Sequence, residues 1–351
     1  MGSQVSSKDT VGVIGAGSFG TAVANLLAEN REVLLYARRP EVAKDLSESR
    51  SYKGRKLNEA VKLTNDLEEV AQKCELIFPI VPSENFREML LKLAPFLYPY
   101  HILIHGTKGF SVNLAEGESL ADLEILDKSQ VKTMSELIRE ETVVRRIGCM
   151  AGPNIAYEID AKEPAATVIA SHFDEVIREG QAALRSPMFR VHGNHDIVGI
   201  ELAGVLKNIM AIVAGIIDGL GFGANTRGLF VTRGLAEIVH IGTGLGANPR
   251  AFLGLAGIGD LVTTSTSSRS RNFIVGQRLA KGESLAEILD SMDEVAEGIK
   301  TVRIIRALAN KHKFAAPITH ALHRTLFEGM DIAKGVRLLM EFPFTEDVEF
   351  I

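Results

Sequence analysis

Cysteine is scarce in this sequence of 351 residues, which contains only Cys74 and Cys149. Neither residue belongs to a CxxC motif or to a Cys/His cluster, so a disulfide framework and a structural zinc site both lack support. We therefore expect no metal site. Because unclustered cysteines are typical of a reducing compartment, we expect a soluble, cytoplasmic protein.

The sequence also lacks a strong excess of charge and a long apolar run. Its 39 basic and 44 acidic side chains give a formal net charge of −5, which provides no general attraction to nucleic acid or to anionic lipid. The longest uncharged stretch in the helix-rich half, Ile209 to Ile217, is well short of the roughly 18 apolar residues that a membrane span needs. We expect no nucleic-acid partner and no membrane span.

The first periodic stretch combines a strand, a glycine-rich loop and a helix. A short buried-strand pattern at Val11 to Ile14 leads into the sequence GAGSFG and then into a helical pattern over residues 21–30. In this order a GxGxxG motif predicts a dinucleotide-binding unit, in which Gly15 permits the tight turn, Gly17 lets the backbone approach a pyrophosphate and Gly20 allows close helix packing. An ordinary strand-to-helix turn is the alternative.

The end of the second predicted strand bears on the choice of nucleotide. This strand, Glu32 to Tyr36, is followed by Ala37, Arg38 and Arg39, where an NAD-selective domain often has an acidic residue that binds the ribose 2′-hydroxyl. Either arginine is suited to a 2′-phosphate instead. We expect the cofactor to be NAD or NADP, and the preference stays open.

Strand and helix patterns alternate as far as residue 196 and then give way to helices alone. This change predicts an α/β protein with a Rossmann-type doubly wound N-terminal domain and an all-helical C-terminal domain. We expect a flexible leader at residues 1–9, a dinucleotide-binding domain at 10–196 and a helical substrate and catalytic domain at 197–351. In such sheets the loops after the strands face the ligand, which draws attention to the loops at residues 81–83, 107–109 and 152–154. Lys108 is the one cation in these three loops, and a solvated surface lysine is the alternative.

A predicted helix in the second half, from about Gly199 to Asp218, is apolar almost all round and should be buried. Lys207 and Asn208 are out of place in it. Burial disfavours the ammonium form of a lysine and moves its pKa down towards the range useful for proton transfer. A lysine whose head reaches solvent is the alternative.

Two later stretches combine polar residues with glycine or arginine. Asp260 lies between glycine and apolar residues in the sequence GIGDL, and Thr263 to Asn272 is rich in hydroxyl groups and arginine. A loop of this kind that leads into a helix is suited to hold a phosphate through hydroxyls, a guanidinium and the first N–H groups of the helix. A Ser/Thr-rich linker with a helix cap is equally consistent with the composition.

Over nearly its whole length the chain resembles the soluble NAD(P)-dependent glycerol-3-phosphate dehydrogenase family. The motifs that carry the resemblance are GAGSFGT at 15–21, TKG at 107–109, GPNIA at 152–156, Glu201 with LKN at 206–208, GFGANTR at 221–227, GIGDL at 257–261, SRN at 270–272 and EG at 297–298. The resemblance implies interconversion of glycerol 3-phosphate and dihydroxyacetone phosphate, a small phosphorylated substrate, and supply of glycerol 3-phosphate for phospholipid synthesis. We also expect a homodimer, because the second domain is helical and buried.

The resemblance also implies a role for particular residues. It implies Lys207 as the proton acceptor in the oxidation of glycerol 3-phosphate, with Lys108 and Asp260 as the other catalytic residues. The implied substrate-binding residues are Lys108, Gly152, Asn154, Lys207, Asp260, Ser270, Arg271 and Asn272. The expected cofactor-binding residues are Gly15, Gly17, Ser18, Phe19, Gly20, Arg38, Lys108, Ala156, Arg271 and Glu297.

Two other functions compete with this one. Another two-domain 2- or 3-hydroxy-acid dehydrogenase is the first, although a hydroxyacyl enzyme needs a His–Glu pair and a site for a large thioester, and the sequence offers no convincing placement for either. The second is a non-catalytic sensor that binds NADPH, against which the presence of Lys108, Lys207 and Asp260 argues.

Residues 117–141 are longer and more charged than the family pattern, and we expect an added surface hairpin or helix there.

Overall fold

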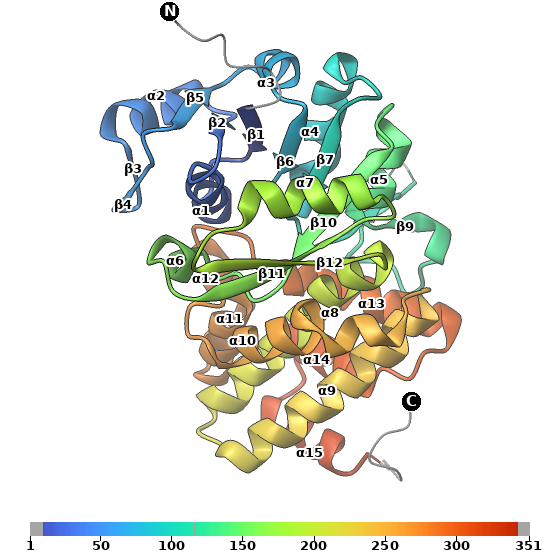
Figure 1. Ribbon diagram of the computed structural model, residues 1–351. Coiled ribbons are helices and arrows are strands. Elements are labelled where there is room, and N and C mark those ends of the chain that lie inside the picture. The colour runs from blue at the N-terminus through green and yellow to red at the C-terminus, as the bar shows by residue number, and fades with distance from the viewer. Residues whose placement is uncertain (1–9, 116, 343–351) are drawn as a thin grey trace, which may run out of the picture. The chain divides into compact units, whose positions relative to one another are not determined.

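The computed structural model of the chain describes residues 10–115 and 117–342 (Figure 1). The leader expected at residues 1–9 lies outside the described residues. Contacts divide the chain into two compact units, of which the first runs to Ser111 and resumes over Thr133–Ile197, and the second contains Val112–Lys132 and the chain from Val198. The expected boundary after residue 196 lies within one residue of this division. The sequence predicted a continuous first domain over 10–196, whereas in the structure Val112–Lys132 belongs to the second unit.

The first unit is built on an eight-stranded sheet with the order β12-β11-β10-β7-β6-β1-β2-β5. Its strands are β1 (Thr10–Ile14), β2 (Glu32–Tyr36), β5 (Val61–Thr64), β6 (Leu76–Pro79), β7 (Ile102–His105), β10 (Arg146–Ala151), β11 (Ala165–Ala170) and β12 (Phe189–Asn194). All neighbours are parallel except β10 and β11. The chain moves from β1 outwards through β2 to β5 and then returns to β6 on the other side of β1, so the strand order reverses beside β1. The predicted Rossmann-type topology, which binds ligands at such a reversal, is confirmed.

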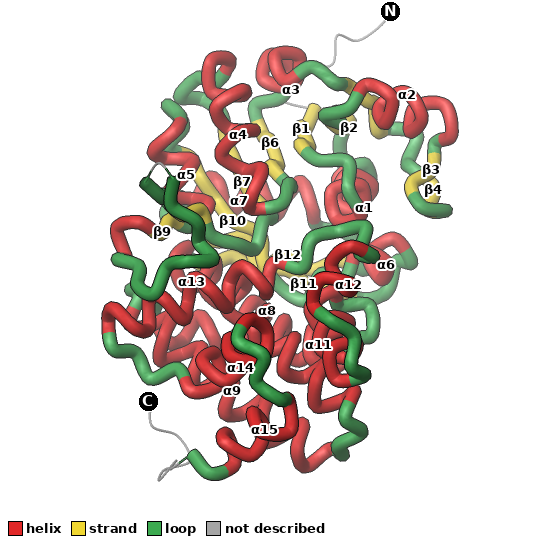
Figure 2. The backbone as a smooth tube through the Cα atoms, turned by 180° about the vertical axis from the view of Figure 1, so that it is seen from behind, coloured by secondary structure: helices red, strands yellow, loops and turns green. Residues whose placement is uncertain are grey.

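Helices cover both faces of this sheet (Figures 1 and 2). They are α1 (Ser18–Leu27), α2 (Pro40–Ser49), α3 (Leu67–Lys73), α4 (Ser83–Leu93), the 3₁₀ turn η1 (Ala94–Phe96), α5 (Met134–Glu141), α6 (Ala156–Asp160) and α7 (Asp174–Leu184), with the small hairpin β3 (Ser51–Tyr52) and β4 (Arg55–Lys56) after α2. Helices α1 and α7 contact each other on one face, and α3, α4 and α5 follow one another on the other face. The central strands β1, β6, β7 and β10 are therefore buried on both sides, which explains their short, mostly apolar sequences.

The second unit is helical, as predicted, apart from β9 (Val131–Lys132), which pairs with β8 (Ser111–Val112). Its helices are α8 (Ile197–Gly219), α9 (Ala224–Gly244), α10 (Asp260–Thr266), α11 (Arg271–Ala280), α12 (Leu285–Asp290), α13 (Glu297–His312), α14 (Pro317–Phe327) and α15 (Ile332–Met340), with the 3₁₀ turns η2 (Lys128–Gln130) and η3 (Pro249–Leu253) and the π-helical turn η4 (Leu255–Gly259). Helix α8 is long and apolar enough to cross a membrane, but 94% of its most apolar window is buried inside the structure, as in the core helix of a folded domain.

Helices α8 and α11 cross at two glycines. A Cβ atom on Gly215 would lie 2.0 Å from the carbonyl oxygen of Phe273, and one on Gly276 would lie 2.0 Å from that of Ile212. No other residue fits at either position, so the two backbones can approach closely. This crossing brings the first turn of α11 to the middle of α8.

The segment Val112–Lys132 is held against α13. The backbone N–H of Leu126 donates to the carbonyl oxygen of Ala307 at 3.1 Å, Asn310 donates to the carbonyl oxygen of Glu124 at 2.8 Å, and Arg306 pairs with the Glu124 carboxylate at 2.9 Å. Residues 117–141, where we expected an added hairpin or helix, contain η2, β9 and α5.

A buried carboxylate joins α9 to the start of α14. Glu237 is 5% exposed and accepts hydrogen bonds from the backbone N–H groups of Ile318 and Thr319, at 2.7 and 2.9 Å, and from the Thr319 hydroxyl at 2.6 Å. These bonds satisfy donors that no other side chain caps, because the residue before α14 is Ala316. Burial nevertheless raises the pKa of Glu237 to about 7.

This raised pKa predicts a pH dependence of stability. Between the ordinary glutamate pKa of 4.5 and about 7, the folded protein keeps a proton that the unfolded chain releases, so the free energy of unfolding falls as the pH rises through this window, by on the order of 3 kcal/mol. Glu237→Gln should remove this part of the slope in urea unfolding measured from pH 5 to 8. The exposed control Glu341→Gln should retain it, and an unchanged slope in Glu237→Gln would contradict the assignment.

Candidate active site

The glycine-rich loop connects β1 to α1 at the point where the strand order reverses. Gly15 has a φ of +121°, and a Cβ atom there would lie 2.1 Å from the carbonyl oxygen of Ile80. A Cβ atom on Gly20 would lie 1.8 Å from the carbonyl oxygen of Gly15. These two glycines are thus required by the loop itself. Gly17 differs, since a Cβ atom there would meet nothing within 4 Å.

The start of α1 is suited to an anion. Gly17 precedes the helix, no side chain caps it, and its first turn contains no acidic residue. The N–H groups of Phe19 and Gly20 therefore lie at the positive end of the helix. The open space at Gly17 and these donors fit a dinucleotide pyrophosphate.

Three further predicted nucleotide contacts lie in the first unit. Arg38 is exposed just after β2 and has no ion pair among the described residues, whereas Arg39 lies 3.8 Å from Glu41. Phe19 is partly buried, with its ring close to Gly106 after β7, and Ala156 begins α6 and packs against the same core. Arg38 is thus the arginine that is better placed to meet a 2′-phosphate.

Lys108 and two other predicted substrate residues come together in the first unit. The Lys108 ammonium donates to the carbonyl oxygen of Gly152 at 3.0 Å. Gly152 has a φ of +150°, and the side-chain amide of Asn154 is hydrogen-bonded to the Thr167 hydroxyl at 2.8 Å. The loops after β7 and β10 are therefore joined by a cation.

The second unit contains a buried ion pair. Nζ of Lys207, on α8, lies 3.0 Å from Oδ1 of Asp260, the first residue of α10. Lys207 is 4% exposed and Asp260 1%. The snorkelling alternative for Lys207 is wrong, because its ammonium ends on a buried carboxylate. Removing two charges from water is unfavourable, so such a pair is weak evidence for a stabilising role and stronger evidence for a functional one.

The start of α11 combines a cap, a cation and a buried amide. The Ser270 hydroxyl caps α11 by accepting from the N–H of Phe273 at 3.4 Å. Arg271 is half-exposed, with Nη1 3.4 Å from Glu294. The amide of Asn272 is buried and donates to Oδ1 of Asn208 at 3.0 Å. The helix cap that we weighed against a phosphate site is present, but it leaves the Ser270 O–H and most of the guanidinium able to donate.

Asn272 also holds the start of α13. Its Oδ1 accepts from the N–H of Gly298 at 3.0 Å, next to Glu297, the first residue of that helix. Asn208 was noticed in the sequence as misplaced but received no role, and its contact with Asn272 shows why it lies in an apolar helix. Glu294, the acidic partner of Arg271, could not be recognised from the sequence, because the periodicity of a helix does not show which side chains meet across a loop.

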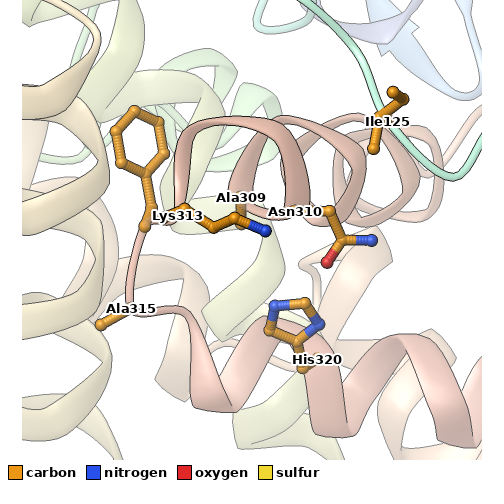
Figure 3. A pocket seen from close by; sticks show the side chains of 7 residues that line it. Ile125, Ala309, Asn310, Lys313, Ala315 and His320 are labelled. Atoms are coloured by element: carbon orange, nitrogen blue, oxygen red, sulfur yellow. The ribbon is translucent and has the colours of Figure 1, made fainter.

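A surface hollow of about 480 Å³ lies elsewhere in the second unit (Figure 3). It is lined by Ile125, Ala309, Asn310, Lys313, Phe314, Ala315 and His320, none of which belongs to a predicted site. Lys313 directly follows α13, where a cation complements the helix dipole, so its position has a structural explanation. Among residues 10–115 and 117–342, no group of three or more His, Cys, Asp or Glu side chains is suited to hold a metal ion.

The two units together define a class of protein. A Rossmann-type domain with an uncapped glycine-loop helix, followed by a helical domain with a buried amine–carboxylate pair, is the arrangement of a two-domain nicotinamide-dependent dehydrogenase. The N-terminal part of the NAD-dependent glycerol-3-phosphate dehydrogenase family matches residues 10–177, and its C-terminal part matches residues 196–337. The chain belongs to this family.

Relatives and solved structures agree with the assignment. A glycerol-3-phosphate dehydrogenase [NAD(P)+] of Teredinibacter turnerae is 41% identical over 97% of this chain and 96% of its own length. That of Pseudomonas aeruginosa strain LESB58 is 39% identical over 99% and 98%. The crystal structure of glycerol-3-phosphate dehydrogenase from Coxiella burnetii has a TM-score of 0.85 at 31% identity, over 95% of this chain and 99% of that one.

The loop geometry predicts different effects for two glycine substitutions. Gly20→Ala should prevent the loop from forming and lower the melting temperature, since its Cβ would overlap the Gly15 carbonyl. Gly17→Ala should melt as the wild type does, yet bind NADH and NADPH at least 10-fold more weakly, because only a bound pyrophosphate needs that space. Thermal unfolding and fluorescence titration measure both. Wild-type affinity in a well-folded Gly17→Ala protein would place the nucleotide elsewhere.

Proposed function

We propose that the protein interconverts sn-glycerol 3-phosphate and dihydroxyacetone phosphate with NAD or NADP. The observation that carries this proposal is the buried pair of Lys207 and Asp260, in a chain whose family acts on glycerol 3-phosphate. A folded helical core gains little from such a pair, whereas a dehydrogenase needs a positioned proton acceptor. When bound, the nicotinamide supplies the hydride chemistry at C2 of the substrate.

Lys207 exchanges the proton of the C2 oxygen. During oxidation its amine takes the hydroxyl proton while the C2 hydrogen leaves as hydride, and during reduction its ammonium returns a proton to the carbonyl oxygen. Asp260 holds the lysine head at 3.0 Å and so fixes the direction from which the proton moves. The low exposure of both groups excludes water as a competing proton donor.

The substrate phosphate binds at the start of α11. Arg271 supplies a forked guanidinium, Ser270 supplies a hydroxyl, and the first turn contains no acidic residue. Charge-assisted donors of this kind suit a phosphate dianion. Asn272 has one remaining amide N–H for the same anion, because its other contacts hold α8 and α13. From the first unit, we assign Lys108, Gly152 and Asn154 to the substrate.

We assign residues of both units to the cofactor as well. Gly15, Gly17, Ser18, Phe19, Gly20, Arg38, Lys108 and Ala156 of the first unit are assigned to the nucleotide, as are Arg271 and Glu297 of the second. The exposed guanidinium of Arg38 favours acceptance of NADP besides NAD. The cellular role that we propose is cytoplasmic supply of glycerol 3-phosphate for phospholipid synthesis.

We further propose that the chain forms a homodimer. Exposed Leu220, Phe222 and Leu229 lie around the α8–α9 connection at 36%, 40% and 38% exposure, and neighbouring apolar side chains of this size are typical of a surface that another chain covers. Light scattering should give twice the mass of 38.1 kDa, and a mass of one chain at micromolar concentration would reject the dimer.

Absorbance at the NAD(P)H band tests the reaction. Purified protein should oxidise NADH or NADPH when dihydroxyacetone phosphate is added, and the ratio of the two rates measures the cofactor preference. Cofactor binding without any oxidation would favour a sensor, and oxidation with a 2- or 3-oxo acid alone would favour another hydroxy-acid dehydrogenase.

Replacement of Lys207 should separate turnover from cofactor binding. Lys207→Met should lower kcat by about 10² to 10⁴ and leave the Kd for NADH within twofold, because the amine acts on the substrate. The single variant removes the ammonium that Asp260 pairs with in the apolar core, which destabilises the fold, so Lys207→Met/Asp260→Asn serves as the control. The double variant should regain stability without activity, and recovered activity would reject Lys207 as the proton acceptor.

Arg271 should act on substrate affinity. Arg271→Ala should raise the KM for dihydroxyacetone phosphate by roughly 10- to 100-fold, since hydrogen bonds to a charged group are lost. Arg269→Ala removes the same charge from an exposed position two residues earlier and should change KM less than threefold. Equal effects of the two substitutions would indicate general electrostatics instead of a phosphate site.

A further inference from the structure

The polarity of the stretch around Asp260 is inverted. Ile258 and Val262 are 38% and 47% exposed, whereas Asp260 between them is 1% exposed. Thr264, one turn after Asp260, is buried as well. Leu261 is the only apolar residue on the buried face of this helix, which also contains Thr264 and Ser265, so the hydrophobic effect alone does not explain its rotation. Some other part of the structure must therefore hold α10 with its carboxylate inside.

The turn before Asp260 sets this rotation. In η4 the N–H of Gly259 donates to the carbonyl oxygen of Gly254 at 3.2 Å. The N–H of Asp260 likewise donates to the carbonyl oxygen of Leu255. Both bonds span five residues, where an α-helix spans four. One additional residue in a turn rotates the following side chains by about 100° around the axis. The π-helical turn thus directs the Asp260 side chain towards Lys207 of α8.

Phe252 fixes the turn from the other side. Its side chain is 1% exposed, and a Cβ atom on Gly257 would lie 2.0 Å from its carbonyl oxygen. At the far end of the ring, a Cβ atom on Gly242 of α9 would lie 2.2 Å from Cζ. Phe252 therefore fills the space between α9 and the turn, with a glycine at each contact.

We infer that Phe252 is a positioning residue that holds Asp260 against Lys207 by setting the π-helical turn between Gly242 and Gly257. The inference rests on the proposed function for its effect on catalysis. The effect of the turn on the position of Asp260 does not depend on that function, because Asp260 is the first residue of α10 and directly follows the turn. A displacement of about 1 Å at a reacting group is enough to lower turnover about 100-fold.

Gly257→Ala is the direct test. Its Cβ would displace the Phe252 carbonyl and rotate the turn, so kcat should fall at least 10-fold while the Kd for NADH stays within twofold. Gly254→Ala is the matched control in the same stretch, since its Cβ would come no closer than 3.9 Å to another atom, and it should keep wild-type kcat. Equal kcat in the two variants would overturn the inference.

Gly242→Ala tests the same contact from α9, outside the turn. Its methyl group would push on the tip of the Phe252 ring, so kcat should again fall. Gly228→Ala, at an open position of the same helix, should leave kcat unchanged. Because leucine is shorter than phenylalanine, Gly242→Ala/Phe252→Leu should be more active than Gly242→Ala alone. Strictly additive losses in this double variant would show that the ring does not transmit the effect.

A readout that needs no turnover separates this inference from the proposed function. The rate at which acetic anhydride acylates Lys207, followed by mass spectrometry across pH, reports how Asp260 holds the amine. The profile should shift in Gly257→Ala and Gly242→Ala but not in the two glycine controls. A shifted profile in an enzyme inactive on dihydroxyacetone phosphate would reject the function alone, and unshifted profiles would reject the positioning role alone.

Discussion

The buried ion pair of Lys207 and Asp260 links α8 to α10 in the core of the second unit, and the orientation of both helices has to satisfy it. Two opposite charges at 4% and 1% exposure are tolerated in an apolar core when they are paired with each other. Helix α8 supplies the amine from the middle of an apolar core, and a π-helical turn rotates α10 so that its carboxylate lies inside while Ile258 and Val262 face outwards. Stability alone would favour apolar side chains at both positions, and the proposed proton transfer gives the arrangement a reason.

The first unit shows a related division between what the fold needs and what a ligand needs. Gly15 and Gly20 are required by the loop itself, whereas the backbone around Gly17 leaves room for another residue. Helix α1 likewise begins without a capping side chain. Groups that the protein leaves open in this way are the ones that a bound dinucleotide completes. The family assignment and this geometry therefore support each other from different observations.

Much of the fold could be predicted because the patterns are local. The glycine loop, the strand at Glu32–Tyr36 and the buried helix around Lys207 each combine periodicity with a diagnostic residue. The antiparallel pairing of β10 with β11, and the passage of Val112–Lys132 into the second unit, depend on contacts between distant segments and left no local signal. Lys207 and Asp260 were each conspicuous, and the resemblance implied that they lie beside each other; the fold shows the contact itself, at 3.0 Å. A helix cap before α11 was foreseen as an alternative, whereas the role of Asn272 as a brace between α8 and α13 was hidden for the same reason.

The most direct test of the account is a crystal structure of the protein with NADH and glycerol 3-phosphate. The account predicts that the C2 hydroxyl oxygen lies within hydrogen-bond distance of Nζ of Lys207, with the phosphate on Arg271 and the first turn of α11. A substrate whose C2 oxygen contacts another side chain, with the pair of Lys207 and Asp260 remote from it, would contradict the assignment of Lys207 as the proton acceptor.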